Sequence, residues 1–157
     1  MIRVLFVCLG NICRSPMAEA VFAQLVREAG LDTHIEADSA GLGAWHIGEA
    51  AHKGTLAVLR EQRIPYEGRA RQLLEADLNA FDFIITMDAS NLRGVRELAR
   101  ASRGHRAHVA PLLSYAPQAG VEEVPDPYYD GGFARVYELV RAGCEGLLRA
   151  IRQEHGL

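Results

Sequence analysis

One cysteine and one arginine have the types and the spacing to do chemistry together. Five residues, Gly10 and Asn11 among them, separate Cys8 from Arg14, and Ser15 follows directly. A cysteine thiolate is a strong nucleophile, and the planar guanidinium of arginine can hold two oxygens of one phosphoryl group, which lysine cannot. The Ser15 hydroxyl can donate to the Cys8 sulfur and stabilise it as a leaving group. The pattern predicts a covalent phosphate site.

The segments on either side would place these residues at one point. The apolar run Val4–Val7 predicts a buried strand, and the amphipathic segment after Arg14 predicts a helix. Gly10 and Asn11 tolerate positive φ angles, so the connection can be a tight turn. Such a turn directs backbone N–H groups at an anion near the positive end of the helix dipole. Ser15 is expected at or near the N-cap, where its side chain can also cap the helix.

The spacing of cysteine and arginine by itself is a weak signal. Many cysteines at the ends of core strands are inert buried residues. The preceding strand, the glycine in the turn and the Ser15-Pro16 pair favour a nucleophilic Cys8. Cys13 has two open interpretations: a small apolar residue behind the turn, or a partner for a reversible disulfide with Cys8 under peroxide. Cys144 is expected to be structural.

Residues Cys8–Pro16 resemble the signature of the low-molecular-weight protein tyrosine phosphatases, and Met17–Ala20 continue it. Further matches, in the family's order, are Asp38–Gly41, Ala70–Gln72, Met87–Asp88, Ser90–Leu92 and Asp126–Tyr129. The resemblance implies hydrolysis of phosphotyrosine in proteins, and of small aryl phosphates, through a cysteinyl-phosphate intermediate. The expected partners are a tyrosine-phosphorylated protein or a small aryl phosphate, and the phosphate ion. The phosphate would be bound by Leu9, Gly10, Asn11, Ile12, Cys13 and Ser15 together with Arg14.

A phosphatase needs an acid that protonates the leaving oxygen and later activates water as a base. The resemblance assigns this role to Asp126, which precedes Pro127. Spacing alone would favour a turn-forming Asp-Pro pair. The neighbouring acids Glu122, Glu123 and Asp130 are interpreted as solvated loop charges.

Aromatic residues supply candidate walls for an aryl group. Trp45 follows a glycine-rich turn, and Tyr128 and Tyr129 flank the acid. Flat ring faces suit offset or edge contacts with a phenyl ring. Leu9 and Ile12 are expected at the edge of the same pocket.

Other residues are expected to support the loop. By resemblance, Asn11 holds its backbone through hydrogen bonds, and Ser39 belongs to the same network. The family's usual histidine before Ala-Arg-Gln is replaced by Gly68, which predicts a shorter or water-filled network. Asp88 is interpreted as a helix cap or a support for the loop. His46, beside Trp45, could touch substrate, but the favoured interpretation is a solvated loop residue.

Three alternatives remain open. A related protein arginine phosphatase tends to carry threonine where Ile12 stands. An arsenate reductase of similar fold would need further redox cysteines, and residues 73–95 contain none. A non-enzymatic oxyanion-binding module would not need Cys8, Arg14 and Asp126 together. No histidine forms a ligand pair with a cysteine or an acid at metal spacing, so we expect no metal and no cofactor.

The order of elements predicts an α/β fold with a central four-stranded parallel twisted sheet and helices on both faces. We expect strands at residues 2–7, 35–39, 81–86 and 107–110, helices at 15–28, 49–61, 90–101 and 132–153, and irregular chain at 111–129. Ligands of such sheets bind beyond the carboxyl ends of the strands, and Cys8 lies at one of those ends.

Composition limits the possible partners. The 157 residues fit one domain, 1–157, with a substantial core. A net charge of −3 gives no basic field for nucleic acid or an anionic membrane. No apolar run approaches the roughly 20 residues of a membrane span, so we expect no membrane insertion. Three cysteines in no scaffold pattern favour a reducing cytoplasm.

Overall fold

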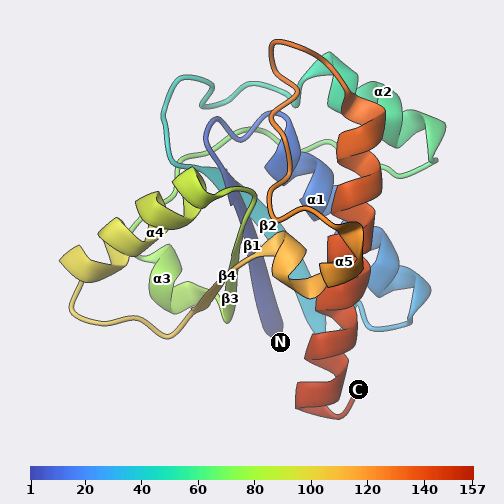
Figure 1. Ribbon diagram of the computed structural model, residues 1–157. Helices are drawn as coiled ribbons and strands as arrows, with labels where there is room; N and C mark the ends of the chain where they lie inside the picture. Colours follow the sequence, from blue (N-terminus) through green and yellow to red (C-terminus); the bar gives the residue numbers. More distant parts are fainter.

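Four parallel strands form the sheet on which the candidate site is built (Figure 1). The structure is a computed structural model that describes all 157 residues. The order across the sheet is β2-β1-β3-β4, and every neighbouring pair is parallel. This confirms the predicted α/β class and sheet. The strands are β1 (Ile2–Cys8), β2 (Ile35–Gly41), β3 (Phe83–Thr86) and β4 (His108–Pro111).

The central strand β1 is buried on both faces, as its apolar sequence requires. Successive side chains point to opposite faces of the sheet. Val4, Phe6 and Cys8 therefore join the larger core, whereas Leu5 and Val7 join the smaller one. Helices cover both faces (Figure 1). The larger core is closed by α1 (Arg14–Glu28), α2 (Lys53–Glu61) and α5 (Phe133–His155), and the smaller one by α3 (Asp77–Ala80) and α4 (Ala89–Ala101).

Several predicted boundaries were wrong for local reasons. The helix expected from residue 49 begins at Lys53, because Ala50 forms an antiparallel bridge with Arg69 and the His52 ring accepts from Gly54 N–H as the N-cap. The one-turn helix α3 was missed, since four residues are too few to show a helical period. The stretch 111–129 contains two short 3-10 helices, η1 (Leu112–Tyr115) and η2 (Pro117–Ala119).

The topology brings distant segments to the carboxyl edge of the sheet. The turn between β1 and α1 lies there, and so does the chain that precedes α5 (Figure 1). Val124 N–H donates to the Met87 carbonyl just after β3, at 2.9 Å. The loop that carries Asp126 is thereby attached beside the loop that carries Cys8. None of the helices combines the length and apolar character that crossing a membrane requires.

Candidate active site

The turn after β1 has its carbonyls turned outward and its N–H groups left free. The carbonyl oxygens of Cys8, Leu9, Ile12 and Cys13 all accept hydrogen bonds from groups outside the turn. In contrast, no hydrogen bond within the protein engages the N–H groups of residues 9–14. A run of unpaired N–H groups at the N-terminus of a helix, here α1, is a binding site for an anion.

Asn11 holds the strained backbone of this turn. Its φ angle is 58°, in the left-handed region that few residues other than glycine adopt. Its side-chain amide is bonded at both ends: Oδ1 accepts from Arg71 N–H at 2.9 Å, and Nδ2 donates to Ser15 Oγ at 2.8 Å. The amide therefore ties the turn both to the 71–72 segment and to the first turn of α1.

Cys8 is buried at the base of the turn and contacts a hydroxyl. Its Sγ lies 3.0 Å from Ser15 Oγ. Since Ser15 Oγ already accepts from Asn11, its own hydrogen is free to point at the sulfur. Ser15 lies near the start of α1 and contacts Cys8, as expected, but the expectation that it also caps the helix was wrong. The N-cap position is Cys13, which makes no side-chain capping bond, and Ser15 lies within the helix.

Arg14 is the first residue of α1, and its guanidinium is buried and held from behind. Nη1 donates to Asp88 Oδ2 at 2.7 Å and to the Val124 carbonyl at 2.9 Å. Nη2 lies 3.7 Å from Asp126 Oδ2. The other carboxylate oxygen of Asp88 accepts from Asn91 N–H and caps α4. Asp88 thus serves as both a helix cap and an anchor for the arginine.

This double use of Asp88 gives a testable prediction for Asp88→Asn. Asparagine caps helices as well as aspartate does, so α4 should keep its cap, and any loss of stability should come from the lost contact with the buried Arg14. Its amide has one oxygen, and if that caps α4 an NH₂ group faces Arg14. Hydrogen bonds to charged groups contribute about 1.5–3 kcal/mol, so kcat/KM for p-nitrophenyl phosphate should fall by about 10–100-fold. An unchanged kcat/KM in a variant of normal melting temperature would contradict this role.

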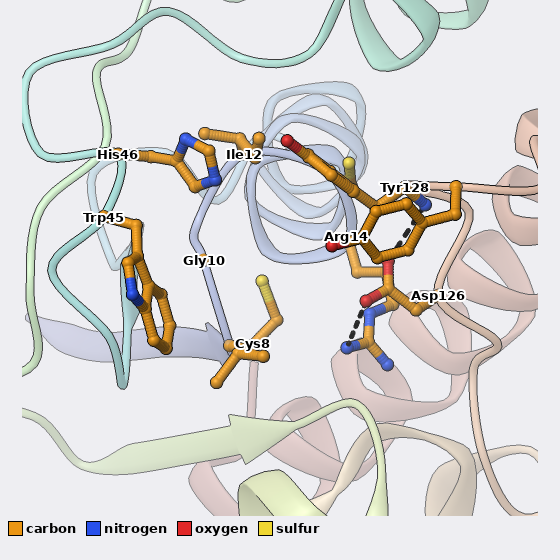
Figure 2. A pocket seen from close by; sticks show the side chains of 11 residues that line it. Cys8, Gly10, Ile12, Arg14, Trp45, His46, Asp126 and Tyr128 are labelled. Carbon is orange, nitrogen blue, oxygen red and sulfur yellow. Dashed lines mark hydrogen bonds and ion pairs between the residues drawn. The ribbon is translucent and has the colours of Figure 1, made fainter.

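These residues open into one pocket of about 400 Å³. Figure 2 shows Cys8 at its base, with Arg14 and Asp126 at one side. The lining consists of Cys8, Leu9, Gly10, Ile12, Cys13, Arg14, Trp45, His46, Asp126, Tyr128 and Tyr129. Three sequence-predicted residues, Asn11, Ser15 and Ser39, lie behind this surface. No group of three or more histidine, cysteine, aspartate or glutamate side chains is arranged to hold a metal ion.

Comparison with known proteins identifies the family. Residues 3–156 match the family described as low molecular weight phosphotyrosine protein phosphatase. The chain belongs to this family. The resemblance drawn from Cys8–Pro16 is therefore confirmed, and with it the assignment to the protein tyrosine phosphatases, which are hydrolases of phosphoric monoesters.

Individual relatives agree over their full length. The low molecular weight protein-tyrosine-phosphatase YfkJ of Bacillus subtilis (strain 168) is 50% identical over 158 residues, with 100% of each chain covered. The crystal structure of YfkJ superposes with a TM-score of 0.94, covering 99% of this chain and 97% of the other. The low molecular weight protein-tyrosine-phosphatase of Streptomyces coelicolor is 47% identical, covering 97% and 94%. The structure of DARP, a drosophila arginine phosphatase, gives a TM-score of 0.91 at 33% identity, covering 95% and 97%.

The walls of the phosphatase pocket come from two loops. Trp45 lies across Gly43, where any Cβ would overlap its ring, and 69% of the tryptophan surface is exposed. On the opposite side, the rings of Tyr128 and Tyr129 meet edge to face with centroids 4.7 Å apart. Trp45 and Tyr128 thus lie on different sides of the pocket (Figure 2).

Of the two interpretations of His46, the structure favours the one near the substrate, because the residue lines the pocket. Its Nδ1 lies 2.8 Å from Glu49 Oε2, and its ring centroid is 5.9 Å from that of Tyr128. The ring also lies against Gly10, whose Cβ, if present, would be 3.1 Å from His46 Cδ2. The adjacent Trp45 was the only sequence signal for this position.

Cys13 is buried and unpaired, as is Cys144. Burial raises the pKa of the Cys13 thiol to about 12, and the charges of Asp126 and Cys8 act in the same direction against the opposing effect of Arg14. Cys13 therefore stays protonated at neutral pH and is a poor nucleophile. Burial also raises the pKa of Cys144, which packs in the core against α1.

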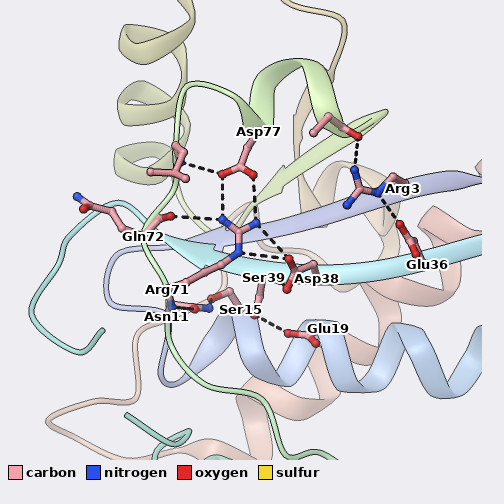
Figure 3. A network of polar contacts seen from close by, with 12 residues as sticks. Arg3, Asn11, Ser15, Glu19, Glu36, Asp38, Ser39, Arg71, Gln72 and Asp77 are labelled. Atoms are coloured by element: carbon pink, nitrogen blue, oxygen red, sulfur yellow. Dashed lines mark hydrogen bonds and ion pairs between the residues drawn. The ribbon is translucent and has the colours of Figure 1, made fainter. Parts of the chain in front are cut away.

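Ser39 belongs to a network different from the one expected. Its Oγ donates to Glu19 Oε1 at 2.6 Å (Figure 3). Tyr66 Oη donates to the same oxygen at 3.1 Å. Burial raises the pKa of the Glu19 carboxyl, and these two hydrogen bonds offset the effect only in part. The hydroxyl of Tyr66 lies where a side chain on Gly68 would point. A tyrosine therefore fills the space expected to be short of partners or filled with water.

Arg71, whose backbone N–H donates to Asn11, is itself held by ion pairs. The Arg71 guanidinium pairs with Asp38 at 3.1 Å and with Asp77 at 3.0 Å (Figure 3). This ion-pair cluster links β2 to α3. It fixes the backbone that donates to Asn11.

The contact between Tyr66 and Gly68 leads to a stability prediction. A Cβ on residue 68 would overlap the Tyr66 hydroxyl and ring, so Gly68→Ala should lower the free energy of unfolding by about 1–3 kcal/mol, the usual cost of overpacking. In a Tyr66→Ala background the same change should cost much less. A double-mutant cycle by urea unfolding measures this coupling, and additive effects would contradict the predicted overlap.

Proposed function

We propose that this protein hydrolyses phosphotyrosine in proteins, and small aryl phosphates, through a phosphate ester on the Cys8 sulfur. The observation that supports this most is the turn of free N–H groups around Cys8, with the Arg14 guanidinium beside it. Such a cradle suits a phosphoryl group, whose developing charge is spread over three equatorial oxygens.

In the first step, the Cys8 thiolate attacks phosphorus in line with the leaving oxygen. Arg14 exchanges its contact with Asp126 for two phosphoryl oxygens, and the N–H groups of the turn bind the others. Asp126, in its protonated form, donates to the departing phenolate oxygen. The S–P bond forms, the P–O bond breaks and tyrosine leaves as a neutral phenol.

In the second step, water replaces the tyrosine. Asp126, now a carboxylate, removes a proton from this water, which attacks phosphorus and breaks the S–P bond. The Ser15 hydroxyl stabilises the thiolate as it leaves, through the 3.0 Å contact with sulfur. Inorganic phosphate is released, and Asp126 is protonated for the next cycle.

The walls of the pocket support a tyrosine rather than an arginine substrate. Trp45, Tyr128 and Tyr129 present flat aromatic faces to a phenyl ring, and Ile12 adds an apolar edge. One structural relative is named an arginine phosphatase, so phosphoarginine is the alternative substrate to test. Rates on matched phosphotyrosine and phosphoarginine peptides test the choice. We expect a preference for phosphotyrosine, and a reversed preference would favour the arginine activity.

We also infer a protein substrate in a reducing compartment, the cytoplasm, without a nucleic acid partner. Three unpaired cysteines support the compartment, and the net charge of −3 offers no general attraction for nucleic acid.

A further inference from the structure

The loop that carries Asp126, here called the acid loop, also contains a glutamate that is hydrogen-bonded to the start of a neighbouring helix. Glu123 Oε2 accepts from Ala89 N–H, the first residue of α4, at 2.7 Å. Glu123 is an exposed loop residue, as expected, and this hydrogen bond is a partner that the sequence did not indicate. A carboxylate at this place is favoured twice, by the unpaired N–H groups of the first helical turn and by the positive end of the helix dipole.

Glu123 lies three residues before Asp126. The next residue, Val124, is anchored through both backbone groups: its N–H donates to Met87 and its carbonyl accepts from Arg14. Only Pro125, whose ring fixes φ, separates this anchored pair from Asp126. The positions of residues 123 and 124 therefore constrain the position of Asp126.

The Asp126 side chain has little else to hold it. Its Oδ1 accepts only from the nearby Tyr128 N–H at 3.1 Å, and its Oδ2 is 3.7 Å from Arg14, beyond hydrogen-bond distance. Downstream, Pro127 is buried, and the Tyr128 ring packs near His46 and His52 at centroid distances of 5.9 and 5.8 Å. Upstream, the chain is held by the hydrogen bonds of Glu123 and Val124, so these bonds contribute to where the carboxyl lies.

We propose that Glu123 is a positioning residue for Asp126. Its carboxylate, bonded to the first N–H of α4, attaches the acid loop so that the Asp126 carboxyl faces the leaving oxygen. This inference rests on the proposed function of Asp126. Because it concerns protonation of the leaving group, it predicts an effect that depends on the substrate, which a general loss of stability would not produce.

The test compares Glu123→Ala with Glu122→Ala, a neighbouring glutamate that makes no hydrogen bond in the structure. For phenyl phosphate, whose poor leaving group needs the acid, kcat/KM of Glu123→Ala should fall by about 10-fold, a part of the 10²–10⁴ that general acid catalysis contributes. For 2,4-dinitrophenyl phosphate, whose leaving group needs little help, it should stay within about twofold. Glu122→Ala should match the wild type on both substrates.

A second arm removes the acid. In an Asp126→Asn background, Glu123→Ala should cause no additional loss on phenyl phosphate, because no acid remains to be positioned. Equal losses on both substrates, additive losses, or no loss at all would overturn the inference. If Glu123→Ala folds poorly, Glu123→Gln, which retains a neutral acceptor, should show a smaller loss with the same dependence on the leaving group. A wild-type protein inactive on both substrates would instead reject the proposed function.

Discussion

Replacement of Cys8 by serine should abolish turnover of every aryl phosphate while leaving the fold and the phosphate site intact. A hydroxyl is not ionised at neutral pH and lacks a base beside it, whereas a thiolate attacks without one. The exchange of sulfur for oxygen is nearly isosteric, and the N–H groups of the turn and Arg14 do not depend on it. Steady-state assays with p-nitrophenyl phosphate measure the loss.

Phosphate binding provides the control for this variant. Inorganic phosphate should still raise the melting temperature of Cys8→Ser, because the cradle of N–H groups and the guanidinium remain. A Cys8→Ser protein that binds phosphate but does not turn over separates loss of the nucleophile from loss of the site. Near-normal turnover of the purified variant would remove covalent catalysis from the mechanism.

Asp126→Asn should slow hydrolysis of phenyl phosphate by roughly 10²–10⁴-fold, the range that general acid–base catalysis contributes. An amide can neither give a proton to the leaving oxygen nor take one from water. The side chain keeps its size and its exposed position at the rim, so stability should be unaffected. The loss in kcat/KM should shrink as the leaving group improves, because a good leaving group departs as an anion.

The matched control is Asp130→Asn, which neutralises a nearby loop carboxylate outside the pocket lining. It should retain wild-type kcat/KM across the leaving-group series. If Asp130→Asn showed the loss and Asp126→Asn did not, the acid would have been assigned to the wrong residue.

Local features of this site could be predicted from the sequence because they lie in one short segment. Cys8, Arg14 and the turn between them are consecutive, and the apolar run before them and the helix after them have clear patterns. The parallel sheet follows from the alternation of strands and helices. The role proposed for Asp126 rests on the family resemblance, because an Asp-Pro pair by itself indicates only a turn.

Contacts between distant segments could not be predicted in this way. Arg14 is bonded to Asp88, which is 74 positions away, and to the carbonyl of Val124, 110 positions away. The sequence around each of these residues does not indicate which distant residue it contacts. The same holds for the bond of Tyr66 to Glu19, 47 positions apart.

Two residues show which contacts could be predicted and which could not. The contact of the Ser15 hydroxyl with Cys8 was predicted, but the cap on α1 was not formed, because the helix begins at Arg14 and Ser15 lies within it. Glu123 is an exposed loop residue, as predicted. Its hydrogen bond to the first N–H of α4 could not be predicted, because that helix start is 34 positions away in the sequence.

The most direct test of the central claim is to trap the phosphorylated enzyme. Wild-type protein is mixed with p-nitrophenyl phosphate radiolabelled in its phosphate, quenched within milliseconds, digested and analysed by mass spectrometry. We predict close to one label per chain at most, attached to the sulfur of Cys8 in the peptide containing residues 8–14, and none in Cys8→Ser. Turnover without any labelled protein, or a label on another residue, would contradict the proposed mechanism.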